Sequence, residues 1–571
     1  MLVDHARVGR HLATMRIAPV RPGLLAAIVL VAGCFEATPW PPCTLEAGPE
    51  CFDTTSAGQN TESGSTSDGT APTTGIQTVT GAQVTSEPST TTGTTSSGPG
   101  ELGPLTITDM RLMPDELKSA GIVTVEVDVE GADAVSMSVD LGEPVALVPM
   151  NAGTFTGEIA VFGESWNGTH DVVAIATRDE EVSEPWPATF TVAASAAGGE
   201  AWLKKSSLVP SYGNAIDVDD QGGVVELFTY STPEGQRCHL RRRDTDGEVV
   251  WLGDSRWIAH GFDCAGEDVK FAPDGTIWAL VNVYENGFGR WQIWHLDDDG
   301  LPLGQTPEEG NLTHMGRGLD VNVAGDVLLC GTRPATPGED DAWVRLRRVD
   351  TEPWTQPWDY RAPYALDKVH KFSERTQDCA FVEDRIVVVG DAVGPHEQGN
   401  PDIQTRGFAV EFSFTATVLA DVANPAALAW HSGNQALAPG HAGGYVVAGD
   451  NCNAMVSPCN ATKGVLRWFS LGATQVEMQP TANAKHLTDI AWSAAGYAVV
   501  AAQGLQNEDG FLVQGWSSGA AEPVLHYQGG PTKLQVATGI AADQVGFIFA
   551  GGYFQELDDT LAAGVAKVHP Y

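Results

Sequence analysis

The feature that most constrains the fold of this chain is an internal repeat that begins near residue 199. One strand-like pattern of alternating apolar residues occurs seven times, at intervals of roughly fifty residues. Its copies are 238–242, 291–295, 342–346, 407–411, 464–468, 510–514 and 564–568. A single unit of this length cannot bury its apolar face alone, so the sequence predicts that consecutive units stack on one another.

Earlier in each unit, an apolar segment, a Gly/Asp turn and a second apolar segment follow one another. The clearest examples are 269–278, 319–329, 490–500 and 540–550. The segments after the turn are nearly continuous apolar runs, such as 386–389. Runs of this kind are typical of strands that are covered on both faces by neighbouring sheets.

Four strands per unit and seven units resemble a seven-bladed β-propeller of the NHL-like or bacterial β-propeller-repeat kind, over residues 200–571. The last unit ends at Tyr571 just after its third strand, and 200–204 matches the outer strand 248–252. We therefore expect an N-terminal strand to complete the last blade and close the ring, because an unpaired blade edge would invite aggregation. The domain boundaries predicted for this part are 196–571.

Residues 104–195 form a separate unit of short alternating segments, including 123–127, 135–139 and 171–175. Alternation with period two predicts strands with one buried face. About seven such strands in some 90 residues resemble an immunoglobulin-like β-sandwich. The Cys–Trp–Cys core of true immunoglobulin domains is absent, so the resemblance concerns architecture alone. The predicted fold class is therefore all-β throughout.

The N-terminal segment 1–34 has the pattern of an export signal, and we expect translation to start at Met15. Arg16 and Arg21 precede the apolar run 24–32, which is too short to span a membrane. Small residues then lead to Cys34, and this ending resembles the lipobox of bacterial lipoproteins. The resemblance implies a diacylglycerol group on the Cys34 sulfur and a membrane contact through the acyl chains. An ordinary signal peptide with a coincidental cysteine is the alternative.

Residues 35–103 are predicted to be a disordered stalk. Between 54 and 100 the chain is dominated by Thr, Ser, Gly and Pro and holds no Lys, Arg or aromatic residue, so it cannot bury enough apolar area to fold. Such a segment spans on the order of 40 Å as a coil and about 150 Å when fully drawn out. With Phe35 after the lipidated cysteine, the expected location is the bacterial outer membrane, with the folded part held away from it.

The net charge of −41 excludes whole classes of partner. Nucleic acids and anionic lipid surfaces are bound by clustered Lys and Arg, so the acidic balance of the chain argues against both. We expect a soluble, monomeric folded part whose partners are the membrane, through the lipid, and a protein or glycan ligand.

Eight cysteines remain beside Cys34, and an even number in an exported protein predicts disulfides. Pairing of neighbours along the chain is the simplest of the 105 possible connectivities. The predicted pairs are Cys43–Cys51, Cys238–Cys264, Cys330–Cys379 and Cys452–Cys459. No CxxC motif and no suitably spaced histidine accompany them, so we expect no metal site. The Asp-rich segments 244–247 and 297–300 are interpreted as hairpin turns rather than calcium loops.

No catalytic motif is found: the sequence has no nucleophile elbow, no P-loop and no dinucleotide fingerprint, and no cofactor is expected. The propeller resemblance implies a ligand site where the segments leading into the innermost strands surround the channel. The polar residues of those segments are the candidate channel or ligand-facing residues: Asp268, His314, Arg317, Arg375, Asp378, His431, Lys485 and His486. They fit either a binding site or a solvated funnel, and no catalytic pair can be selected among them.

Two functions of different classes follow. The first is a lipid-anchored surface protein that displays the propeller as a binding or scaffold module. The second is a propeller enzyme that acts on glycans or small molecules in the central channel. A role in cell-envelope assembly is a third possibility. The missing catalytic motifs favour the first.

Overall fold

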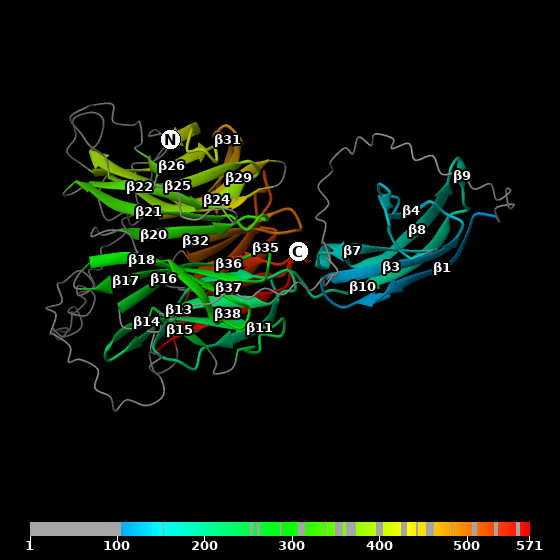
Figure 1. Ribbon diagram of the computed structural model, residues 1–571, viewed down its shortest axis with the longest axis horizontal. Helices are drawn as coiled ribbons and strands as arrows, with labels where there is room; N and C mark the ends of the chain where they lie inside the picture. The colour runs from blue at the N-terminus through cyan, green and yellow to red at the C-terminus, as the bar shows by residue number, and fades with distance from the viewer. Residues whose placement is uncertain are drawn as a thin grey trace, which may run out of the picture. The chain divides into compact units, whose positions relative to one another are not determined.

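The computed structural model describes residues 104–571 with several gaps, and Figure 1 shows the strands that they form. The gaps are 152, 252–254, 260–262, 286–287, 307–313, 337–338, 349–357, 361–372, 396–402, 424–430, 441–442, 453–461, 482–483, 505–510, 530–534 and 556–559. Within the described part, the one helical segment is the short 3-10 helix η1 (Glu164–Trp166), so the predicted all-β class is confirmed. No helix there is long and apolar enough to span a membrane. The predicted signal peptide and stalk lie outside these residues.

Two sheets share one hydrophobic core in the N-terminal part of the described chain. One sheet has the order β1-β3-β7-β6, and the other has the order β2-β10-β8-β4-β5 with β9 paired to β8. The bounds are β1 (Thr106–Met113), β2 (Glu116–Leu117), β3 (Gly121–Glu130), β4 (Ala134–Val139), β5 (Val145–Ala146), β6 (Val148–Asn151), β7 (Thr154–Val161), β8 (Gly168–Arg178), β9 (Glu181–Val182) and β10 (Trp186–Val192).

The period-two alternation read from the sequence creates this core. In β3, Val123, Val125 and Val127 are fully buried, while the residues between them are half exposed. In β8, Val172 and Ala174 are buried in the same way and belong to the same cluster. Because alternate side chains of a strand point to opposite faces, each sheet places one apolar face inward and one polar face outward.

The remainder of the described chain forms four-stranded antiparallel units. The first three are β12 (Ser211–Val218), β13 (Val224–Thr232), β14 (Gly235–Arg243) and β15 (Arg256–Ile258); β16 (Asp263–Phe271), β17 (Ile277–Glu285), β18 (Phe288–Leu296) and β19 (Pro302–Thr306); and β20 (Met315–Val321), β21 (Val327–Thr336), β22 (Glu339–Arg347) and β23 (Trp358–Tyr360).

The next three units are β24 (Ser373–Val382), β25 (Arg385–Pro395), β26 (Ile403–Phe412) and β27 (Val418–Ala423); β28 (His431–Pro439), β29 (Gly444–Cys452), β30 (Thr462–Ser470) and β31 (Thr474–Pro480); and β32 (Ala484–Trp492), β33 (Ala498–Gly504), β34 (Phe511–Trp516) and β35 (Leu525–Gln528). The β24 and β28 units are linked by one parallel bridge, between Thr405 and His431. The last unit combines β36 (Gln535–Ala542), β37 (Ile548–Gln555) and β38 (Leu561–Val568) with the distant strand β11 (Glu200–Lys205).

The first strands of these units form a closed series. Each of β12, β16, β20, β24, β28, β32 and β36 packs against the first strand of the next unit, and β36 packs against β12. This cyclic order of small antiparallel sheets is a propeller-like fold. In Figure 1 the chain's colour passes from green through yellow to red from one unit to the next.

The pairing of β11 with β38 confirms that an N-terminal strand completes the last sheet. The register joins Glu200 to Val568 and Lys205 to Gly564 in antiparallel order. Trp202 packs against Phe549, with 6.1 Å between ring centroids, and its indole N–H donates to the Thr245 carbonyl at 3.0 Å. The strand therefore contacts both its own sheet and the turn that follows β14 in the β12 unit.

The segment 248–252, matched to β11 from the sequence, is bonded to β14 only at its start. Val249 bridges Arg243 and the Val250 N–H donates to Arg242, whereas the regular outer strand of that unit is β15, several residues later. Trp251 nevertheless repeats the role of Trp202, since its indole N–H donates to the Asp298 carbonyl at 2.8 Å.

The Asp-rich segments are turns, as predicted. The Asp244 carboxylate accepts the backbone N–H groups of Asp246 and Glu248, and Gly247 adopts a positive φ of 78°. Asp297 accepts N–H groups in the same pattern. These carboxylates satisfy the amides of a tight turn, which is the usual role of aspartate at this position.

Two predicted disulfides are confirmed, and both join consecutive units. Cys238 on β14 bonds Cys264 on β16, and Cys330 on β21 bonds Cys379 on β24. The pairs Cys43–Cys51 and Cys452–Cys459 include residues outside the described part of the chain.

We expect Trp202→Ala to lower the free energy of unfolding by about 2–3 kcal/mol, because it removes the contact with Phe549 and the bond to the next unit. Trp251→Ala should have an effect of similar size. Chemical denaturation monitored by tryptophan fluorescence and circular dichroism measures both. An unchanged midpoint for Trp202→Ala would contradict the role of β11 in closing the ring.

Candidate functional site

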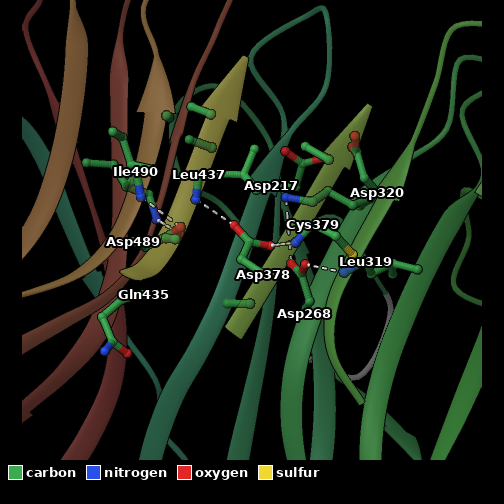
Figure 2. A pocket seen from close by; sticks show the side chains of 18 of the residues that line it. Asp217, Asp268, Leu319, Asp320, Asp378, Cys379, Gln435, Leu437, Asp489 and Ile490 are labelled. Carbon is green, nitrogen blue, oxygen red and sulfur yellow. Dashed lines mark hydrogen bonds and ion pairs between the residues drawn. The ribbon is translucent and has the colours of Figure 1, made fainter. Parts of the chain in front are cut away.

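A pocket of about 370 Å³ lies where the first strands meet. Residues from all seven of these strands line it, so it occupies the centre of the propeller-like ring. Its volume falls in the range of small-molecule sites. Figure 2 shows its lining, in which aspartate side chains from several strands point toward one another.

Each first strand carries a β-bulge at the same place. The register against the second strand shifts by one residue there, so one residue is left without a cross-strand partner. All seven extra residues are polar and all line the pocket. We call them the bulge ring: Asn214, Glu267, Arg317, Gln377, Gln435, Thr488 and Thr538.

Three aspartates directly follow a residue of the bulge ring, and each joins two consecutive units. One carboxylate oxygen accepts the backbone N–H of the next residue in its own strand, at 2.7–2.8 Å. The other oxygen accepts a backbone N–H on the neighbouring first strand, at 2.8–2.9 Å. The contacts to the neighbouring strand are Asp268 to Leu319, Asp378 to Leu437 and Asp489 to Ile540.

Two further aspartates repeat this arrangement two residues further along their strands. Asp320 accepts the N–H of Val321 at 2.9 Å and that of Phe381, on the next first strand, at 2.7 Å. Asp217 accepts the N–H of Phe271 at 2.7 Å. Together with the previous three, these residues are called the inter-sheet aspartates. Their oxygens serve as acceptors for backbone groups at five of the seven junctions between units.

The residue just before the bulge is also bonded to the preceding unit. There, polar side chains of a second strand contact the first strand of the following unit. The Asn282 side chain exchanges two hydrogen bonds with the backbone of Gly316, at 2.9 and 3.1 Å. Asp391 accepts the N–H of Asn434 at 3.0 Å, and the Thr229 hydroxyl accepts that of Gly266 at 3.3 Å. The junctions are thus held by side chains that satisfy backbone groups freed near the bulges.

Lys270 supplies a positive charge among the inter-sheet aspartates. Its Nζ lies 3.7 Å from Asp268 Oδ1. Burial disfavours the charged ammonium, but the carboxylates of Asp268, Asp217, Asp320 and Asp489 outweigh it and hold the pKa of Lys270 well above its ordinary value. The lysine therefore remains charged and partly neutralises the acidic lining.

The same burial raises the pKa of every inter-sheet aspartate. For Asp217 it rises to about 6 and for Asp489 to about 7, and Lys270 counteracts the effect of burial in both. The pKa of Asp378 lies well above its ordinary value because of burial and the neighbouring carboxylate of Asp268. Part of the acidic lining is therefore protonated near neutral pH.

The structure places three predicted channel residues, Asp268, Arg317 and Asp378, in the pocket lining. Arg375 is exposed on β24, and His314 directly precedes β20. His486 lies on β32 with its Nδ1 3.1 Å from Asp450 Oδ2. His431 belongs to β28 and Lys485 to β32, and the structure does not describe their side chains.

Five charged lining residues were not identified from the sequence: Asp217, Glu267, Lys270, Asp320 and Asp489. The signal that could have found them is a residue-by-residue alignment of the seven first strands. In that alignment, Asp489 matches the predicted Asp268 and Asp378, while Asp217, Lys270 and Asp320 share a position.

Among the described residues, no group of three or more His, Cys, Asp or Glu has the geometry of a metal site. The inter-sheet aspartates instead direct their oxygens at backbone N–H groups. The arrangement is suited to joining strands and to presenting polar groups to a ligand.

No protein family and no curated protein matches this chain. Among solved structures, a structural genomics protein of unknown function from Bacteroides thetaiotaomicron has a TM-score of 0.35 at 12% identity, over 82% of this chain and 99% of its own. The polysaccharide lyase Uly1 has a TM-score of 0.43 at 11% identity, over 62% and 90%. An α-L-arabinanase from Penicillium chrysogenum, solved with arabinobiose, has a TM-score of 0.35 at 9% identity, over 62% and 93%. Similarity at this level carries no argument about activity.

We expect the protein to become more stable as the pH falls from about 8 to about 5. Folding raises the pKa of Asp217 to about 6 and that of Asp489 to about 7 from an ordinary 3.8, so between these values the folded chain binds protons that the unfolded chain does not. The free energy of unfolding must then increase as the pH falls through this window. Thermal melting at a series of pH values between 5 and 8 measures the effect. Asp489→Asn should reduce the slope of the melting temperature against pH. A melting temperature that falls steadily from pH 8 to 5 would be inconsistent with these protonation states.

Proposed function

We propose that this chain is an exported lipoprotein, anchored through Cys34, that displays an immunoglobulin-like sandwich and a seven-bladed β-propeller and binds a ligand in the propeller channel. The closed series of seven first strands supports the propeller assignment. Two disulfides between consecutive sheets support a location outside the cytoplasm, because such bonds persist in oxidising compartments.

The observation that carries the binding assignment is the use of the channel carboxylates. In Asp268, Asp378 and Asp489, both oxygens accept backbone N–H groups from two different strands. A general base or nucleophile must be positioned toward its substrate, and these carboxylates are held by backbone N–H groups of two strands. We therefore assign them a structural role and assign the contacts with a ligand to the bulge ring.

An enzyme acting on glycans or small molecules is the second candidate, and one observation favours it. The pKa of Asp489, raised to about 7 mainly by burial, is near the value that suits a general acid at neutral pH. However, Asp489 accepts the N–H groups of Ile490 and Ile540, both at 2.8 Å. These contacts fix its carboxyl group between two strands, which makes the binding function the better supported of the two.

We expect Asp489→Ala to lower the free energy of unfolding by about 2 kcal/mol, because two N–H groups lose their acceptor. Asp220→Ala is the matched control, since Asp220 is exposed in the turn after β12 and should tolerate the change. Denaturant titration at neutral pH measures both. If Asp489→Ala is as stable as the unchanged chain but no longer converts a glycan or small-molecule substrate that the unchanged chain converts, the enzyme function is favoured instead.

We also expect Cys34→Ser to release the protein from the membrane, because the thioether to diacylglycerol needs the sulfur. After expression in a Gram-negative host, fractionation and labelled-palmitate incorporation should find the unchanged chain in the membrane and the variant in the soluble fraction. Cys43→Ser is the control and should stay in the membrane. Membrane retention of the Cys34→Ser variant would rule out the proposed anchor.

A further inference from the structure

We propose that the bulge ring takes a neutral, polyhydroxylated ligand, meaning a sugar or a polyol. This inference rests on the proposed binding function and names the ligand class of the same site. It rests on the hydrogen-bond donors and acceptors of the bulge ring that make no hydrogen bond to other described residues.

The bulge ring has no net charge. It holds one acid, Glu267, and one base, Arg317, and they are paired with 3.1 Å between Arg317 Nη1 and Glu267 Oε2. The other Glu267 oxygen accepts from Asn282 at 2.6 Å. The remaining five members are amides and hydroxyls: Asn214, Gln377, Gln435, Thr488 and Thr538. A ligand held by this ring meets neutral groups on most sides.

The ring keeps free donors. Gln435 has no hydrogen-bond partner among the described residues, and Figure 2 shows its amide extending away from the aspartates with no bond drawn to it. Asn214 accepts from the Thr229 hydroxyl through its Oδ1 at 2.8 Å, which leaves its amide N–H groups without an acceptor among the described residues. The Arg317 side chain is 41% exposed and uses one nitrogen in its ion pair.

The ring keeps free acceptors as well. Gln377 donates to Asp391 at 3.3 Å through Nε2, so its Oε1 is left to accept. The hydroxyls of Thr488 and Thr538 donate to backbone carbonyls at 2.7 and 2.9 Å, and each oxygen retains lone pairs. Hydroxyl groups both donate and accept, so a chain or ring of hydroxyls matches this mixture.

The layer next to the bulge ring disfavours the charged alternatives. An anion would lie close to the inter-sheet aspartates, and those that are ionised would repel it. A cation would find carboxylate oxygens already directed at backbone N–H groups, and the positive charge of Lys270 already lies beside Asp268. Neutral hydroxyls avoid both costs and use the groups that remain.

The test is isothermal titration of the full chain with three oligosaccharide sets of equal length. The neutral set is cello-, xylo- and malto-tetraose, the acidic probe is tetragalacturonate, and the basic probe is the chitosan tetramer. We expect a neutral oligosaccharide to bind, and Gln435→Ala or Asn214→Ala to weaken it on the order of tenfold through a lost hydrogen bond. Gln221→Ala is the matched control because Gln221 is exposed in a turn, and it should bind as the unchanged chain does.

Gln435→Glu is a second variant that keeps the size of the side chain and adds a charge, and thermal melting confirms that every variant is folded. If tetragalacturonate or the chitosan tetramer binds more tightly than every neutral probe and loses affinity in Gln435→Ala, the neutral class is overturned while channel binding stands. If a neutral probe binds equally well to the Gln435 and Asn214 variants, the channel site itself is overturned. Absence of binding by all probes overturns the inference.

Discussion

The rest of the structure depends on one kind of interaction, in which a buried side-chain oxygen on one sheet accepts a backbone N–H of the next. Asp268, Asp378 and Asp489 each bind two strands in this way, and Asp217 and Asp320 repeat the contact further along. Backbone bridges between consecutive sheets are few among the described residues, so side chains supply most of the hydrogen bonds between them. Burial of these carboxyl groups is also what raises their pKa values and sets the charge of the pocket.

The bulges connect this framework to the pocket. An extra residue in each first strand locally interrupts the pairing and gives one additional side chain to the central face. The interruption creates backbone groups that Asn282 and Asp391 satisfy from the neighbouring second strands. The additional side chains form a polar ring at one level of the channel. One irregularity, repeated in every unit, therefore produces both the junctions and the surface offered to a ligand.

Much of this fold could be predicted because it is repeated. Seven copies of one pattern located the strands, and the match between 200–204 and 248–252 located β11, although the outer strand of that unit is β15. Two disulfides followed from proximity along the chain. The pocket was harder to predict, since Asp268 and Asp378 were found but Asp489 was not. A bulge changes which residues of a strand face the channel, and its position depends on pairing between strands that simple alternation does not encode.

The pairing of Glu200 with Val568 has a consequence for how such a chain can mature. The two residues lie at opposite ends of the repeat region, so this contact joins segments that are very far apart in the sequence. A chain that emerges from its N-terminus must leave β11 without its neighbour until the final strands have appeared. Intermediate sheets can form in turn, but the edge of β11 stays open to foreign strands throughout. This exposure ends only when the last strands have been synthesised, so chaperones would matter most at this late step of assembly.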